Sequence, residues 1–257
     1  MRVRWYLVGL LFPLLGARDG VALGAESAAR DVIEEGRSDD YSGTYVLLQQ
    51  TATIAEIPVL ADVIAIARAV SLQNLAHRGS RLQGTGKVCH LQVETSSSLA
   101  QTEIPAAFRR SLPDVRTDAE VTYKDGTVSF RQAPQTLVVG AKLKAGEPLP
   151  IEPRDPRVFD QDLDEKPGVT VRVSGLISGD IYLVQRSTSR LYGSLRGAAF
   201  TGRIDFQNEQ SVLGTTNRLF GSGPDPRPIP ARSYFRLERV SDHSTCEDAT
   251  RLAAGWR

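Results

Sequence analysis

Short segments in which apolar and polar residues alternate are the feature that most constrains the fold of this chain. Val169, Val171 and Val173 alternate with polar neighbours, and Phe235 and Leu237 do so near the C-terminus. A period of two places successive side chains on opposite faces of a β-strand. These segments therefore predict strands that bury one face and expose the other.

Residues 120–130 predict a β-hairpin. The Asp125-Gly126 dipeptide at their centre favours the positive φ angles of a two-residue turn, so that Val121 on one arm faces Phe130 on the other. Strand-like composition recurs in further segments: residues 45–53, 70–75, 86–95, 135–139, 180–187 and 201–206.

One short helix is predicted over residues 104–112. Ile104, Phe108 and Leu112 recur every four residues, and Pro105 stands in the first turn, where its missing N–H is harmless. Residues 54–69 fit either a helix or a buried strand, because their periodicity does not separate the two. Together the elements predict an all-β fold, an antiparallel barrel or a two-sheet sandwich of about ten strands with one short helix.

A signal peptide is predicted over residues 1–25. Arg2 and Arg4 precede an apolar run, and Ala22 and Gly24 place small side chains where signal peptidase requires them. The apolar run is too short to cross about 30 Å of hydrocarbon, and no later run reaches the roughly 18 apolar residues of a spanning helix. We therefore expect an exported protein, periplasmic or extracellular, without a transmembrane anchor.

The rest of the chain is expected to be a polar lead-in, residues 26–40, followed by a single β domain, residues 41–257. Two proline-rich segments, residues 147–156 and 223–230, are predicted to be surface loops because proline cannot donate to a sheet. A weak echo between residues 45–53 and 181–189 suggests two related halves, 41–146 and 157–246, joined by the first of these connectors. Shared strand composition is the favoured explanation of the echo.

The charge of the chain is balanced. There are 31 Lys and Arg residues against 30 Asp and Glu residues, and removal of the signal leaves the balance near neutral. This excludes the basic footprint of a nucleic-acid-binding protein. Hydrophobic residues make up 41% of the chain, enough for a packed core.

Two cysteines, Cys89 and Cys246, are predicted to form a disulfide, because an exported chain folds in an oxidising compartment. The competing interpretation is a zinc site that adds His90 and His243 to the two sulfurs. Adjacent residues of a strand point to opposite faces, so Cys89 and His90 do not easily reach one ion. The sequence favours the disulfide.

An acidic segment begins at Asp160 and predicts a calcium site. Asp160, Asp162 and Asp164 supply carboxylates at alternate positions, as oxygen-rich calcium loops do. The match to an EF-hand loop then fails, because Glu165 replaces the required glycine and Val171 cannot supply the final bidentate carboxylate. A solvated turn without metal is the alternative interpretation.

The sequence contains no nucleophile-elbow, zinc-protease, phosphate-loop or paired-cysteine motif. Its three histidines, His77, His90 and His243, have no neighbours that complete a catalytic set. The chain is therefore expected to be a non-enzymatic binding or structural protein, with a small apolar ligand in the barrel as a candidate partner. Two alternatives stay open: a calcium-stiffened envelope or adhesion module, and a hydrolase built from two carboxylates that only the tertiary structure brings together.

Overall fold

The computed structural model of the protein describes residues 40–55, 62–97, 100–218, 220 and 226–256. The predicted signal peptide and nearly all of the polar lead-in lie outside the described residues. Along the chain the elements are β1 (Gly43–Ala55), β2 (Val63–Arg78), β3 (Arg81–Thr95), β4 (Ala100–Glu103), α1 (Ala106–Ser111), β5 (Val115–Lys124), β6 (Thr127–Gln132), β7 (Gln135–Val139), β8 (Val169–Gly175), β9 (Gly179–Arg196), β10 (Ala199–Thr215), β11 (Arg227–Pro228), a short 3-10 turn η1 (Pro230–Arg232), β12 (Tyr234–Val240) and α2 (Cys246–Ala254).

Eight antiparallel strands close into a barrel. Their order is β10-β12-β1-β2-β3-β5-β6-β9, and β9 pairs again with β10 to complete the ring. The N-terminal strand β1 and the C-terminal strand β12 are neighbours in this ring. The predicted all-β fold is confirmed, and strands from both of the suggested halves build the same barrel.

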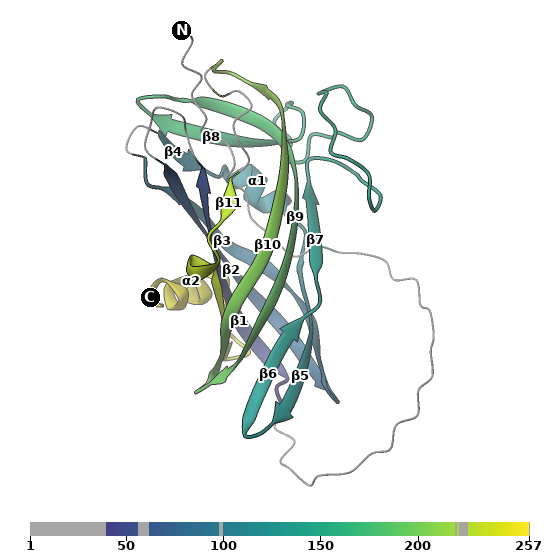
Figure 1. Cartoon of the computed structure of the whole chain (residues 1–257), viewed down its shortest axis with the longest axis vertical. Coiled ribbons are helices and arrows are strands. Elements are labelled where there is room, and N and C mark those ends of the chain that lie inside the picture. Colours follow the sequence, from purple (N-terminus) through teal and green to yellow (C-terminus); the bar gives the residue numbers. More distant parts are fainter. Residues whose placement is uncertain (1–39, 56–61, 98–99, 219, 221–225, 257) are drawn as a thin grey trace.

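The long strand β9 organises the remaining strands. One of its edges pairs with β10 along the whole length, while its other edge pairs in turn with β6, β7 and β8. Strand β4 then pairs with β8. Figure 1 shows β9 and β10 running along the molecule, with β5 and β6 at one end and β4 and β8 at the other.

Glycines permit the tight curvature of the wall. Gly193 of β9 and Gly202 of β10 lie opposite each other. A Cβ atom on Gly202 would come 2.1 Å from the carbonyl oxygen of Tyr192, and one on Gly193 would come equally close to that of Thr201. Only glycine fits at this approach, and glycine kinks of this kind let a sheet bend and close.

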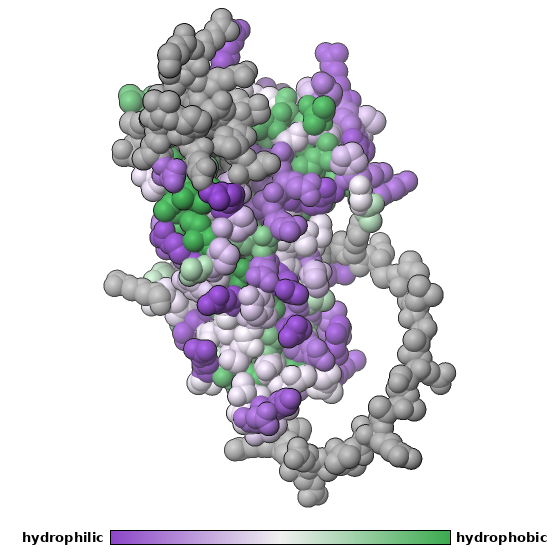
Figure 2. Space-filling view, viewed as in Figure 1, coloured by the Kyte–Doolittle hydropathy of each residue, from purple (hydrophilic) through white to green (hydrophobic). Residues whose placement is uncertain are grey.

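Two apolar clusters fill the barrel at different heights. The cluster at the β5–β6 end contains the rings of Phe130, Phe200 and Phe235. The ring centroid of Phe130 lies 5.4 Å from that of each of the other two. The cluster at the β4–β8 end is largely aliphatic and includes Val171 of β8 and Phe108 of α1. On the face seen in Figure 2, hydrophilic side chains cover much of the outer wall, as expected where the apolar rows point inward.

Helix α2 packs on the outer face of β1 and β2. Its Ala249 and Ala253 pack on Val46, Leu48 and Val70 in a third apolar cluster. The helix was not predicted, although Thr245 and Asp248 form the reciprocal capping box that marks a helix start. Among the described residues, no helix is long and apolar enough to cross a membrane.

The predicted disulfide is confirmed. Cys89 on β3 and Cys246 in the first turn of α2 are bonded, with their Cα atoms 5.0 Å apart. Because both sulfurs are committed to each other, the zinc interpretation is excluded for this pair. The bond fastens α2 to the wall of the barrel.

The remaining local predictions hold with altered limits. The predicted helix is α1, which buries Phe108. In the ambiguous segment, residues 54–55 end β1 and residues 63–69 belong to β2, while residues 56–61 lie outside the described part of the chain. Several strands are much longer than predicted, with 18 residues in β9 and 17 in β10.

Candidate functional site

A belt of uncharged polar side chains crosses the barrel interior between the two apolar clusters. Its buried members come from six strands of the sheet, and we call them the polar belt: Gln49, Ser71, Gln73, Thr117, Gln132, Gln135, Gln185, Ser187 and Ser189.

Strand register places these side chains inside. On β9, Gln185, Ser187 and Ser189 occupy alternate positions between Leu183 and Leu191, which belong to the two apolar clusters. Residues two apart on a strand share a face, so all three polar residues point into the barrel with the leucines. The belt therefore interrupts an otherwise apolar inner row.

Part of the belt is satisfied by its own hydrogen bonds. The Gln73 amide donates to the Ser71 hydroxyl at 3.0 Å, and the Thr117 hydroxyl donates to Gln73 Oε1 at 2.6 Å. On the other side of the barrel, the Gln185 amide donates to the Ser187 hydroxyl at 2.5 Å. These bonds fix the orientation of their side chains.

Another part of the belt is unsatisfied. Gln132 is 0% exposed, and neither its Oε1 nor its Nε2 has a hydrogen-bond partner among the described residues. The Oε1 atoms of Gln49 and Gln135 and the hydroxyl of Ser189 are also buried without a hydrogen-bond partner among the described residues. A buried polar group left unpaired costs about 1–3 kcal/mol, so native proteins pair such groups with water or a ligand.

Three unsatisfied groups lie close together. Gln135 of β7 pairs with Ser189 of β9, and Gln132 ends the strand just before β7. They present hydrogen-bond acceptors and, through the Gln132 amide, donors toward one region of the interior. No Asp, Glu, Lys, Arg or His belongs to the belt, so it offers hydrogen bonding without a charged group.

Small residues lie beside the belt. The inner row of β2 reads Ala65, Ala67, Ala69 and Ser71, and Ala69 lies opposite Gln49. An eight-stranded barrel is just wide enough to be filled by side chains or to hold one small ligand. Alanine side chains at these positions occupy less of the interior than larger residues would.

The three predicted calcium ligands lie together. One carboxylate oxygen from each of Asp160, Asp162 and Asp164 lies within 4.8 Å of the other two. Burial raises the pKa of Asp162, and the neighbouring carboxylates of Asp164 and Asp160 raise it further. Val171 is buried in β8, so the departure from an EF-hand loop stands.

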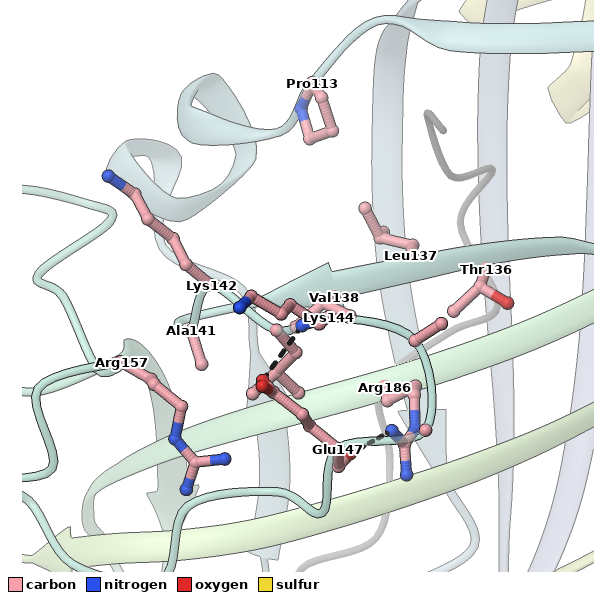
Figure 3. A pocket seen from close by; sticks show the side chains of 13 residues that line it. Pro113, Thr136, Leu137, Val138, Ala141, Lys142, Lys144, Glu147, Arg157 and Arg186 are labelled. Carbon is pink, nitrogen blue, oxygen red and sulfur yellow. Dashed lines mark hydrogen bonds between the residues drawn. The ribbon is translucent and has the colours of Figure 1, made fainter. Parts of the chain in front are cut away.

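A pocket lies outside the barrel beside β7 and has a volume of about 950 Å³. Figure 3 shows Lys142, Lys144, Arg157 and Arg186 around it, with Glu147 among them. The guanidinium groups are already engaged. Arg157 pairs with Asp155 at 2.6 Å and lowers the pKa of that carboxyl to about 2.

The guanidinium of Arg186 is also engaged by neighbouring groups. It forms an ion pair with Glu209 and donates to the Glu147 carbonyl at 2.6 Å. These contacts hold the connector after β7 against the barrel wall. The pocket is thus explained by the packing of a surface connector rather than by convergent free groups.

The predicted site residues are therefore brought together in two places, at the disulfide and at the acidic loop. The polar belt was not predicted, although the inward spacing of Gln185, Ser187 and Ser189 was a signal for it. His90 and His243 do not join the cysteines in a common site, because the sulfurs are bonded to each other. Comparison of the chain with protein-family models, with curated proteins and with solved structures found no match.

Proposed function

We propose that this protein is an exported, non-enzymatic barrel that binds one small uncharged molecule at its polar belt. The observation that carries the proposal is Gln132, a fully buried amide without a partner for either polar atom. Gln135 and Ser189 add unpaired groups next to it. A ligand that donates to the oxygens of Gln132 and Gln135, accepts from the Gln132 amide and hydrogen-bonds the Ser189 hydroxyl would satisfy all three residues.

The chemistry of the belt refines the ligand class. A purely apolar molecule would leave the glutamines unpaired, at a cost of about 1–3 kcal/mol for each group. Apolar clusters lie on both sides of the belt. The favoured ligand is therefore amphipathic, with amide, hydroxyl or carbonyl groups in its middle and apolar parts beyond them.

The proposed location is the periplasm or the extracellular space. The Cys89–Cys246 disulfide supports this location, since such bonds persist in oxidising compartments. The proposal predicts that the protein isolated after export begins near residue 26 and retains the disulfide.

The test is native mass spectrometry of the oxidised protein purified after export. We expect a fraction with one added small molecule that is released on denaturation and then identified. Gln132→Leu should weaken rebinding of that molecule about tenfold, the equivalent of one lost hydrogen bond of about 1.4 kcal/mol. Gln92→Leu on β3, exposed and outside the belt, is the matched control and should leave binding unchanged.

Two results would overturn the proposal. The first is an adduct-free protein that also binds nothing in a thermal-shift screen of uncharged amphipathic molecules. The second is equal loss of affinity in Gln132→Leu and Gln92→Leu, which would place the ligand elsewhere.

A further inference from the structure

We infer that Asp160, Asp162 and Asp164 bind one calcium ion, which fastens the connector between β7 and β8 to the barrel. The carrying observation is Asp162, only 6% exposed, whose Oδ1 has no hydrogen-bond partner among the described residues. Its carboxylate lies within 4.8 Å of the carboxylates of Asp160 and Asp164. This site is independent of the polar belt.

The cluster lacks a compensating cation. Within the described residues, no lysine or arginine forms an ion pair with any of the three carboxylates. The nearest basic residue in sequence is Lys166, and its ammonium lies over the ring of Tyr182. A buried carboxylate that is neither fully hydrogen-bonded nor paired is expensive, and two further anions beside it add repulsion. A divalent cation removes both costs.

The carboxylate oxygens of the three aspartates favour calcium over other metal ions. All three side chains offer carboxylate oxygens, the hard ligands that calcium takes in flexible numbers and geometries. Zinc and copper sites use imidazole or thiolate, which this loop lacks. Magnesium needs near-ideal octahedral geometry and usually keeps several waters, so it should bind here more weakly than calcium.

The backbone orients the carboxylates before an ion binds. Asp160 accepts the backbone N–H groups of Asp164 at 3.1 Å and of Glu165 at 2.8 Å. The second oxygen of Asp162 accepts the Thr170 N–H at 3.0 Å. Each of these oxygens keeps a lone pair for a cation, and a pre-organised site loses less entropy on binding.

The loop connects separate parts of the fold. Between the first two aspartates, Gln161 accepts the Gly140 N–H at 2.7 Å and donates to the Ser111 carbonyl at 3.2 Å. Asp162 reaches Thr170 at the start of β8. An ion held by the three aspartates would therefore stiffen a loop that contacts the end of α1, the residue after β7 and the start of β8.

The test titrates calcium chloride into the oxidised protein and follows melting temperature, binding heat and trypsin cleavage of the connector after its basic residues Lys142, Lys144, Arg154 and Arg157. We expect calcium to raise the melting temperature and slow cleavage of the connector, while magnesium chloride at equal concentration does much less. Asp162→Asn keeps the shape and removes one charge, so it should lower calcium affinity about tenfold or more.

Asp114→Asn, at an exposed aspartate between α1 and β5, is the matched control and should respond to calcium as the unmodified protein does. Circular dichroism without calcium checks that Asp162→Asn is folded. Absence of both binding heat and a melting shift at millimolar calcium overturns the inference, and so does an equal response of Asp162→Asn. Neither result bears on the ligand of the polar belt, which is assayed without metal.

Discussion

Single residues in the barrel interior differ in whether their polar atoms are paired. Gln73 is bonded to Ser71 and Thr117, whereas Gln132 has no such bonds among the described residues. The two amides are equally enclosed, at 1% and 0% exposure. Comparing substitutions at these two positions therefore measures the free-energy cost of a buried polar group that has no hydrogen-bond partner.

Replacing each amide with leucine should have opposite effects on the ligand-free protein. Gln132→Leu removes an unsatisfied group and should leave the free energy of unfolding unchanged or raise it by about 1 kcal/mol. Gln73→Leu breaks two hydrogen bonds and leaves the Thr117 hydroxyl without its acceptor, so it should lower this free energy by about 1–3 kcal/mol. Urea denaturation measures both. Equal destabilisation by the two variants would show that Gln132 is paired in solution.

The sequence could predict some of the site residues but not all of them. Cys89 and Cys246 were assigned from the compartment and their number, and the three aspartates from their spacing. The inward direction of Gln132 follows from the predicted hairpin, because Gln132 lies two residues after Phe130 on the same strand. The pairing of Gln135 with Ser189 was hidden, because β7 and β9 are distant from one another in sequence. Register over such separations cannot be inferred from a local pattern.

At the scale of elements, the predictions were best where local chemistry decides. The Asp125-Gly126 turn gave the β5–β6 hairpin, and residues 135–139 coincide with β7. Strand β9 was predicted only to residue 187 because Ser187 and Ser189 continue its inner row with polar groups, which ends the apolar alternation. The polar belt is thus the physical reason that β9 was predicted too short.

The attachment of α2 is an element-scale feature that reduction should reveal. The Cys89–Cys246 bond closes a long loop, because the sequence separation of the two cysteines is 157. The double variant Cys89→Ala with Cys246→Ala should lower the free energy of unfolding by about 2–5 kcal/mol. Urea denaturation with and without reductant checks this, since reductant should shift the unmodified protein and leave the double variant unchanged. Coincident midpoints in all four conditions would contradict it.

The cap of α2 should make the helix sensitive to acid. The Thr245 backbone N–H and hydroxyl donate to the Asp248 carboxylate, and these bonds hold the pKa of Asp248 below its ordinary value of 3.8. A lowered pKa in the folded state means that the stabilisation is present above pH 3.8 and is lost as the pH falls through the folded value.

Asp248→Asn tests this contribution. The variant should show a smaller loss of stability between about pH 5 and 2 than the unmodified protein, because it no longer has the carboxylate that must be protonated. Denaturation curves across this range provide the measurement. Glu247→Gln, one residue away and exposed, is the control and should retain the full acid dependence.

At the scale of the whole molecule, closure of the barrel depends on the last strand. Strand β12 lies between β10 and β1 and is the only connection between them in the described ring. The sheet therefore stays open, with two unpaired edges, until the C-terminal part of the chain is in place. Folding should be slow, because the pairing that closes the ring joins residues near the two ends of the chain.

Two truncations separate the role of β12 from that of α2. A chain that ends at Ser233 lacks β12 and should expose the edges of β1 and β10, so we expect aggregation or a poorly dispersed NMR spectrum. A chain that ends at Ser244, with Cys89→Ala, loses α2 but keeps the complete ring. It should stay folded with lower stability, because only the apolar patch at Val46, Leu48 and Val70 is uncovered. A well-dispersed spectrum from the shorter chain would show that ring closure does not stabilise the fold, since its interior clusters would then persist without Phe235 and Leu237.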